Sequence, residues 1–129
     1  MRNNFDITVI EEEVKSILRG LKVSDRIYSN RPKSADSSSD FVVALVSGNL
    51  VDKGAYGECM LSIYLYARDN DSIKNWKKLS SMYQKVVNGF PAETERLVFD
   101  IYPDVGSDTP DDFGFHRRLI RIQTIIKQK

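Results

Sequence analysis

The residues of this chain best suited to catalysis are one histidine, His116, and one cysteine, Cys59. Arg117 and Arg118 follow the histidine directly, and their charges disfavour protonation of its ring. A metal site needs several converging ligands, and a lone histidine with the scattered acids of a loop does not supply them. Cys59 falls on the apolar side of an alternating segment, which predicts inert packing. The chain also lacks the nucleophile-elbow, zinc-protease and phosphate-loop motifs. We therefore expect no catalytic, metal or cofactor-binding residues.

An acidic loop at residues 104–112 precedes a basic segment near the end of the chain. The acids do not match the spacing of a calcium-binding EF-hand loop. Arginines interleaved with phenylalanines can bind single-stranded nucleic acid, but the signature of RNA-recognition strands is absent. Opposite charges can equally join two copies of one protein, and we favour that interpretation over a specific nucleic-acid ligand. The predicted interface residues of this kind are Asp108, Asp111, Asp112, Arg117, Arg118 and Arg121.

Residues 58–68 alternate between an apolar set and an amphipathic set, which is typical of a half-buried strand. The amphipathic set contains Met60, Tyr64 and Tyr66. Methionine and tyrosine are enriched at protein interfaces, so these three residues are also predicted interface residues. The alternative is that a third layer or the chain's own loops cover them.

The remaining elements follow from periodicity and capping. A helix is predicted over 8–21, started by a capping box of Thr8 and Glu11. A second helix is predicted between caps in 69–72 and Gly89, with Ile73 and Trp76 on its buried side. Strands are predicted at 26–29, 41–47, 58–68, 96–102 and 113–126. The order α-β-β-β-α-β-β predicts an α+β fold. We expect a mostly antiparallel four- to five-stranded sheet with two helices packed on one face and the other face largely free.

Length and charge limit the remaining possibilities. The 129 residues predict a single domain over 1–129, with flexible loops at 30–40 and 104–112 and a frayed tail at 127–129. A net charge of +1 gives no overall field to attract nucleic acid or a membrane. The polar start and the absence of a long apolar run predict a soluble protein made in a cytoplasm.

The layout of the chain resembles that of a known family. A first helix leads to the stretch Asp25-Arg26-Ile27-Tyr28, with Pro32 nearby, and then come a long alternating strand, a helix and two closing strands. This order is similar to that of the tail terminator (tail completion) proteins of long-tailed bacteriophages and prophages.

The resemblance implies a structural virion assembly protein without catalytic residues or cofactors. It implies self-assembly into a ring, typically a hexamer, that caps the tail tube and joins it to the head connector. The implied partners are the tail tube protein and a head-completion protein, and no membrane. The implied location is the bacterial cytoplasm during assembly, followed by the head-proximal end of the virion tail. A stand-alone module that binds a ligand or protein on an uncovered sheet face is the alternative, and a small enzyme is the third.

Overall fold

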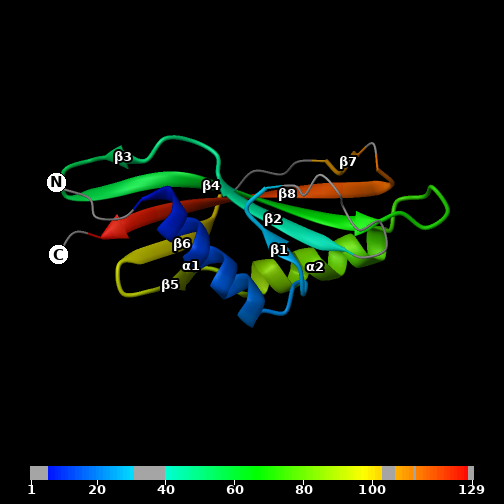
Figure 1. Ribbon diagram of the computed structural model, residues 1–129. Helices are drawn as coiled ribbons and strands as arrows, with labels where there is room; N and C mark the ends of the chain where they lie inside the picture. Colours follow the sequence, from blue (N-terminus) through cyan, green and yellow to red (C-terminus); the bar gives the residue numbers. More distant parts are fainter. Residues whose placement is uncertain (1–5, 31–39, 103–106, 112, 128–129) are drawn as a thin grey trace.

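A computed structural model describes residues 6–30, 40–102, 107–111 and 113–127 (Figure 1). The two helices are α1 (Ile7–Gly20) and α2 (Trp76–Asn88). The strands are β1 (Ile27–Tyr28), β2 (Phe41–Val46), β3 (Val51–Asp52), β4 (Tyr56–Arg68), β5 (Ala92–Glu93), β6 (Leu97–Ile101), β7 (Thr109–Pro110) and β8 (Phe115–Lys127). The described part of the chain is therefore α+β.

The strands form one sheet in the order β1-β2-β4-β8-β6-β5, with β3 added to β4 and β7 added to β8. The prediction of a mostly antiparallel four- to five-stranded sheet is wrong, because the described residues form eight strands in a mixed sheet. β3, β5 and β7 have two residues each, too few to show a periodic pattern. β1 pairs with β2 in parallel, with Ile27 opposite Val42 and Tyr28 opposite Val43, and this pair makes the sheet mixed.

β4 and β8 form the spine of the molecule. They pair antiparallel along their whole length, from Tyr56 opposite Lys127 to Arg68 opposite Phe115. Thirteen residues in each strand make this ladder about 40 Å long at the usual rise per residue. The prediction of a frayed tail is wrong at Lys127, which is paired, whereas residues 128–129 lie outside the described residues.

Helix α1 begins one residue before the predicted start, and its cap differs from the predicted one. The Asp6 side chain accepts a hydrogen bond from the Val9 backbone N–H at 3.0 Å, which satisfies one of the open donors of the first turn. Thr8 and Glu11 therefore do not form the predicted capping box. The Glu11 carboxylate instead accepts a hydrogen bond from the Val46 backbone N–H at 2.8 Å and ties α1 to β2.

Helix α2 begins later than predicted, at Trp76, with Asn75 as its cap. Asp71 and Ser72 both have positive φ, at 50° and 67°, and the chain makes a tight turn there before the helix starts. This turn leaves Ile73 and Trp76 69% and 60% exposed, so their predicted burial is wrong. The residues that α2 does bury are Leu79, Met82 and Val86.

The main core lies between the sheet and the two helices, which lie on the same side of it (Figure 1). The apolar set of the 58–68 alternation faces this core and is buried, as predicted. Phe99 of β6 and Ile122 of β8 are fully buried there too. The residues that the helices and β4 contribute to this core are Ile10, Val14, Leu18, Leu79, Met82, Val86, Cys59, Leu61, Ile63, Leu65 and Ala67.

The opposite face of the sheet is divided into two halves. Near the β1–β2 edge it holds a second, mainly aromatic cluster of Phe41, Val43, Tyr66 and Phe115, all buried. The rings of Phe41 and Tyr66 stack with centroids 4.4 Å apart. The expectation that this face is largely free is therefore wrong for this half. In the other half Arg121 and Gln123 of β8 are exposed.

The predicted loops are only partly described. Residues 31–39, 103–106 and 112 lie outside the described residues. Within the predicted loop 104–112, Thr109 and Pro110 form β7 and pair with Arg117 and His116 of β8. This part of the acidic segment is therefore held against the end of β8.

Candidate functional site

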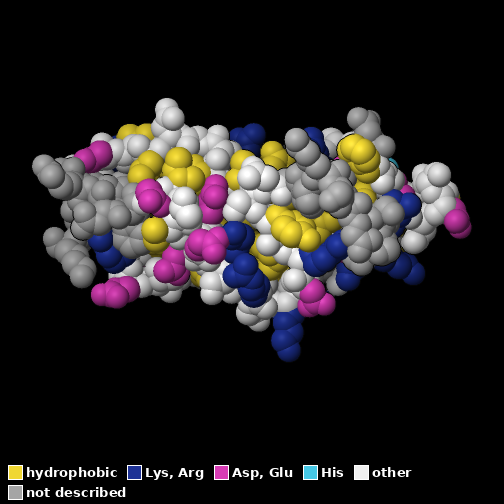
Figure 2. Space-filling model, viewed as in Figure 1, with side chains coloured by type: hydrophobic (Ala, Val, Ile, Leu, Met, Phe, Trp, Pro, Cys, Tyr) yellow, Lys and Arg dark blue, Asp and Glu magenta, His cyan; other side chains and the backbone are white. Residues whose placement is uncertain are grey.

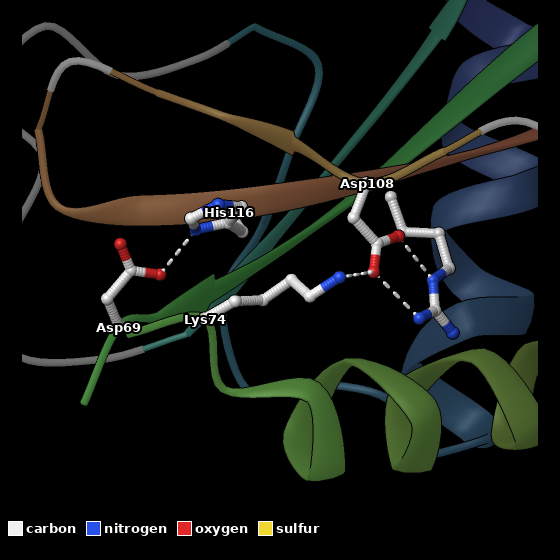
Figure 3. Close-up of polar contacts among 5 residues, drawn as sticks. Asp69, Lys74, Asp108 and His116 are labelled. Carbon is white, nitrogen blue, oxygen red and sulfur yellow. Dashed lines mark hydrogen bonds and ion pairs between the residues drawn. The ribbon is translucent and has the colours of Figure 1, made fainter. Parts of the chain in front are cut away.

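Asp108 lies at the centre of the best-defined polar cluster (Figure 3). Its carboxylate accepts hydrogen bonds from Arg118 Nε at 2.7 Å and Arg118 Nη2 at 2.9 Å, and from Lys74 Nζ at 3.2 Å. The Asp108 side chain is only 6% exposed. The bond from Arg118 is the main reason that the pKa of Asp108 lies below its usual value, and the same bond raises the pKa of Arg118. Two predicted interface residues thus neutralise each other inside one subunit.

His116 forms a separate pair with Asp69. The Nδ1 atom of the imidazole lies 2.7 Å from Asp69 Oδ1, and the side chains are 20% and 11% exposed (Figure 3). The imidazole donates through Nδ1 when that nitrogen carries a proton and the Asp69 carboxylate accepts. Across the described residues, no group of three or more His, Cys, Asp or Glu side chains could hold a metal ion.

Cys59 is far from this pair. Ala67 is the β4 residue opposite His116, and Cys59 stands eight positions before it. At the usual rise per residue, Cys59 therefore lies about 26 Å from Ala67 along the strand. The thiol is 5% exposed, and burial raises its pKa to about 11. A buried thiol of this kind is a poor nucleophile, and the arrangement forms no Cys–His dyad.

Arg117 points to the opposite face and takes part in the second cluster. Its Nη1 donates to the Tyr66 hydroxyl at 3.4 Å, and its guanidinium carbon lies 5.1 Å from the centre of the Tyr64 ring. The bond to Tyr66 is the main reason that the pKa of Arg117 is raised. Tyr66 itself is 2% exposed. Tyr66 therefore packs inside the subunit and does not present its ring to a partner.

The other predicted interface residues have different positions. Asp111 accepts a hydrogen bond from the Phe113 backbone N–H at 2.6 Å and shapes the turn into β8. Asp112 lies outside the described residues. Met60 and Tyr64 are partly exposed on the second face, and Arg121 is exposed opposite Ser62. Met60, Tyr64 and Arg121 are the predicted residues best placed to meet a partner there.

The structure also exposes large apolar side chains that were not predicted as interface residues. At one end of the β4–β8 ladder, which we name the α2 end, Ile73, Trp76 and Phe113 are 69%, 60% and 58% exposed. The Asp69 backbone N–H donates to the Gly114 carbonyl at 2.9 Å and joins the two loops that carry them. Helical spacing predicts burial for Ile73 and Trp76, so no sequence pattern identifies this surface.

The other end of the ladder, which we name the β3 end, exposes a different apolar set. Val51 of β3 is 41% exposed and Tyr56 of β4 is 39% exposed. A groove of about 210 Å³ lies beside them, on the second face of the sheet. It is lined by Gly48, Asn49, Val51, Glu58, Cys59, Met60 and Gln123. We name it the β3 groove.

The charges of the two ends differ. Lys74, Lys77 and Lys78 surround the start of α2, whereas Asp52 and Glu58 lie on the paired strands at the β3 end. On the face shown in Figure 2, acidic side chains gather mostly over the half with β3 and the first turns of α1, and basic side chains gather mostly over the half with α2. On this face the two halves of the subunit therefore carry mostly opposite charges.

A second cavity lies on the helix side of the molecule. This cleft of about 320 Å³ is lined by residues of the α1–β1 turn, of α2 and of the start of β2. Lys78 reaches Asp40 at 3.5 Å, and Lys85 donates to the Lys22 carbonyl at 3.3 Å across its walls. Its lining residues are Lys22, Val23, Ser24, Asp25, Arg26, Asp40, Lys78 and Lys85.

Within the described ranges, neither helix has the length and apolar character required to cross a bilayer. No protein-family model matches the chain, and no curated protein matches it with significant sequence similarity.

Proposed function

We propose that this protein is a non-enzymatic structural subunit that assembles head-to-tail into a ring, as the tail terminator proteins it resembles do. The observation that carries the proposal is the difference between the two ends of the subunit. The α2 end exposes Trp76 and Phe113 among lysines, and the β3 end exposes Val51 and Tyr56 beside acids. Trp, Tyr and Phe are enriched at protein interfaces, and opposite charges favour contact between unlike ends.

Head-to-tail assembly needs two different, complementary surfaces on every subunit, and it gives a closed ring when the rotation between neighbours closes. The paired strands β4 and β8 hold the two surfaces about 40 Å apart on one continuous ladder. Such a ladder fixes the relative orientation of the two surfaces, which is what closure of a ring requires.

The proposed contact differs from the one suggested by charge pairing alone. Asp108 and Arg118 are satisfied within the subunit, so in this proposal they hold β7 and α2 in place. The contact is made instead by the exposed apolar residues of the two ends. Arg121 lies on the open part of the second face, where the tail tube or head-completion protein would bind.

A stand-alone binding module is the second candidate, and the cleft between the α1–β1 turn and α2 favours it. Its volume of about 320 Å³ falls within the usual range for small-ligand sites, about 300–1,000 Å³. Four cationic side chains and two carboxylates line it, which suits a small anion. Nothing beyond the lining favours this function, so we rank it second.

Solution mass separates the two candidates. We expect light scattering after size-exclusion chromatography to give one discrete oligomer, a hexamer if the resemblance holds, and negative-stain electron microscopy to give closed rings. The oligomer should weaken when salt is raised, because the two ends carry opposite charges. A protein that stays monomeric at every concentration and at low salt would contradict the assembly function.

A further inference from the structure

We propose that Trp76 of one subunit inserts into the β3 groove of the next subunit and is the main anchor of the ring contact. This inference rests on the proposed function and names the residues that carry it out. Trp76 lies at the α2 end and the groove lies at the β3 end, at opposite ends of a ladder about 40 Å long. The two features cannot meet within one subunit, so the contact joins two copies.

Trp76 has the properties of an interface anchor. It is the first residue of α2. The side chain of Asn75, the cap of this helix, accepts a hydrogen bond from the Lys78 backbone N–H at 3.2 Å, which holds the start of the helix in place. Trp76 is 60% exposed. Covering an aromatic side chain of this kind buries about 150–250 Å². Tryptophan is also among the residues most enriched at energetic hot spots of interfaces.

The β3 groove has the size and chemistry to receive one bulky side chain. Its volume of about 210 Å³ lies below the range of about 300–1,000 Å³ that is usual for small-molecule pockets. Val51 and Met60 provide apolar walls, and methionine packs well against aromatic rings. The Glu58 carboxylate and the Gln123 amide oxygen line the same groove, and either can accept a hydrogen bond from the indole N–H, which only donates.

Charge adds to this match. Lys77 Nζ lies 5.7 Å from the centre of the Trp76 ring, and Lys74 is two positions away. Glu58 lies in the groove and Asp52 lies on β3 beside it. Insertion of the indole therefore brings Lys77 toward Asp52 and toward Glu58, which Lys53 Nζ approaches at 3.5 Å within its own subunit. Ile73 and Phe113 are as exposed as Trp76, but they have no side-chain donor for the polar groups of the groove.

Trp76 is the single tryptophan of the chain, so its fluorescence reports directly on the contact. We expect the emission to shift to shorter wavelength over the same protein concentrations at which the oligomer forms. Trp76→Ala should weaken the contact by about 30-fold or more, the effect of a hot-spot residue. Phe113→Ala, a matched aromatic truncation at the same end, should weaken assembly by much less than Trp76→Ala does.

Mixing variants tests the pairing itself. Met60→Lys fills the groove. Val51→Asp is a second groove variant, at a more exposed position. Circular dichroism melts show which of the two variants keep the fold. Each groove variant and Trp76→Ala should be monomeric alone. A mixture of Met60→Lys or Val51→Asp with Trp76→Ala still offers one intact anchor and one intact groove, so it should form dimers and nothing larger, with a blue-shifted emission.

The possible failures are distinguishable. If rings form but the emission of Trp76 does not shift, or if Trp76→Ala assembles normally, the anchor is wrong and the assembly function stands. If Phe113→Ala abolishes assembly while Trp76→Ala does not, the anchor is likewise overturned. If the unmodified protein never associates, the proposed function fails, and this inference fails with it.

Discussion

Replacing Asp108 by Asn tests whether the pair with Arg118 acts inside one subunit. The substitution keeps the shape of the side chain but removes its charge. Asp108 accepts two hydrogen bonds from Arg118 and one from Lys74, all from charged donors. Each such bond contributes about 1.5–3 kcal/mol to folding. The amide keeps one acceptor oxygen, and Arg118 and Lys74 are 24% and 40% exposed, so water replaces part of the loss.

We therefore expect Asp108→Asn to lower the free energy of unfolding by about 2 kcal/mol near neutral pH. For a chain of this length that corresponds to a fall of about 6–10 °C in melting temperature. The pKa of Asp108 is lowered in the folded protein, so its contribution is complete above the ordinary value of 3.8 and is lost as pH falls through the lowered pKa. The stability difference between the variant and the unmodified protein should therefore be constant at higher pH and shrink below that value.

The assay is urea unfolding followed by circular dichroism, with Asp71→Asn as the control. Asp71 is exposed at a positive φ that asparagine also tolerates, so this variant should change stability by less than about 0.5 kcal/mol. A double-mutant cycle of Asp108→Asn with Arg118→Gln should give a coupling energy of at least about 1 kcal/mol. A coupling energy near zero, or a loss of stability that depends on protein concentration, would refute the reasoning and place the pair between subunits.

Three further predictions concern the core, the thiol and one turn. Phe99 is fully buried, so Phe99→Ala should cost about 3–5 kcal/mol of unfolding free energy in the same urea assay; a cost under about 1 kcal/mol would contradict its place in the core. Cys59, with its pKa raised to about 11, should react slowly with a disulfide reagent at about pH 8 and quickly once denaturant is added, and equal rates would show an accessible thiol. Gly114 has φ +86°, and a Cβ there would lie 2.7 Å from Arg68 Nη1, so Gly114→Ala should lower the free energy of unfolding by more than about 1 kcal/mol. Gly48→Ala is the control and should change stability little, because a Cβ at Gly48 meets nothing within 4 Å. Similar melting temperatures for the two variants would contradict this prediction.

Local patterns predicted those parts of the fold that depend on nearest neighbours. The alternation of residues 58–68 identified the buried face of β4, because side chains alternate between the faces of any strand. The periodicity of 8–21 located α1 to within one residue. In contrast, nothing local distinguishes the two-residue strands β3, β5 and β7, which exist only because a longer strand lies beside them.

The candidate site shows the same limit. The sequence predicts Asp108 and Arg118 as complementary charges between copies, but it cannot say whether such charges meet within one copy or between two. The answer depends on β7 folding back on β8, for which a threonine and a proline carry no signal. The exposure of Trp76 was missed because a turn at Asp71 and Ser72 delays the helix, and helical spacing alone assigned the ring to the core.

The position of β8 in the sheet has a consequence for biosynthesis. β8 lies between β4 and β6, and the strand order places it as the link that brings β6 and β5 into the sheet. While the ribosome is still translating the residues before 115, the inner edge of β4 has no neighbour, and β6 and β5 have no sheet to join. Unpaired edges of this kind favour aggregation, and pairing across such sequence separations is slow. The sheet can therefore reach the strand order described here only after residues 115–127 have emerged from the ribosome.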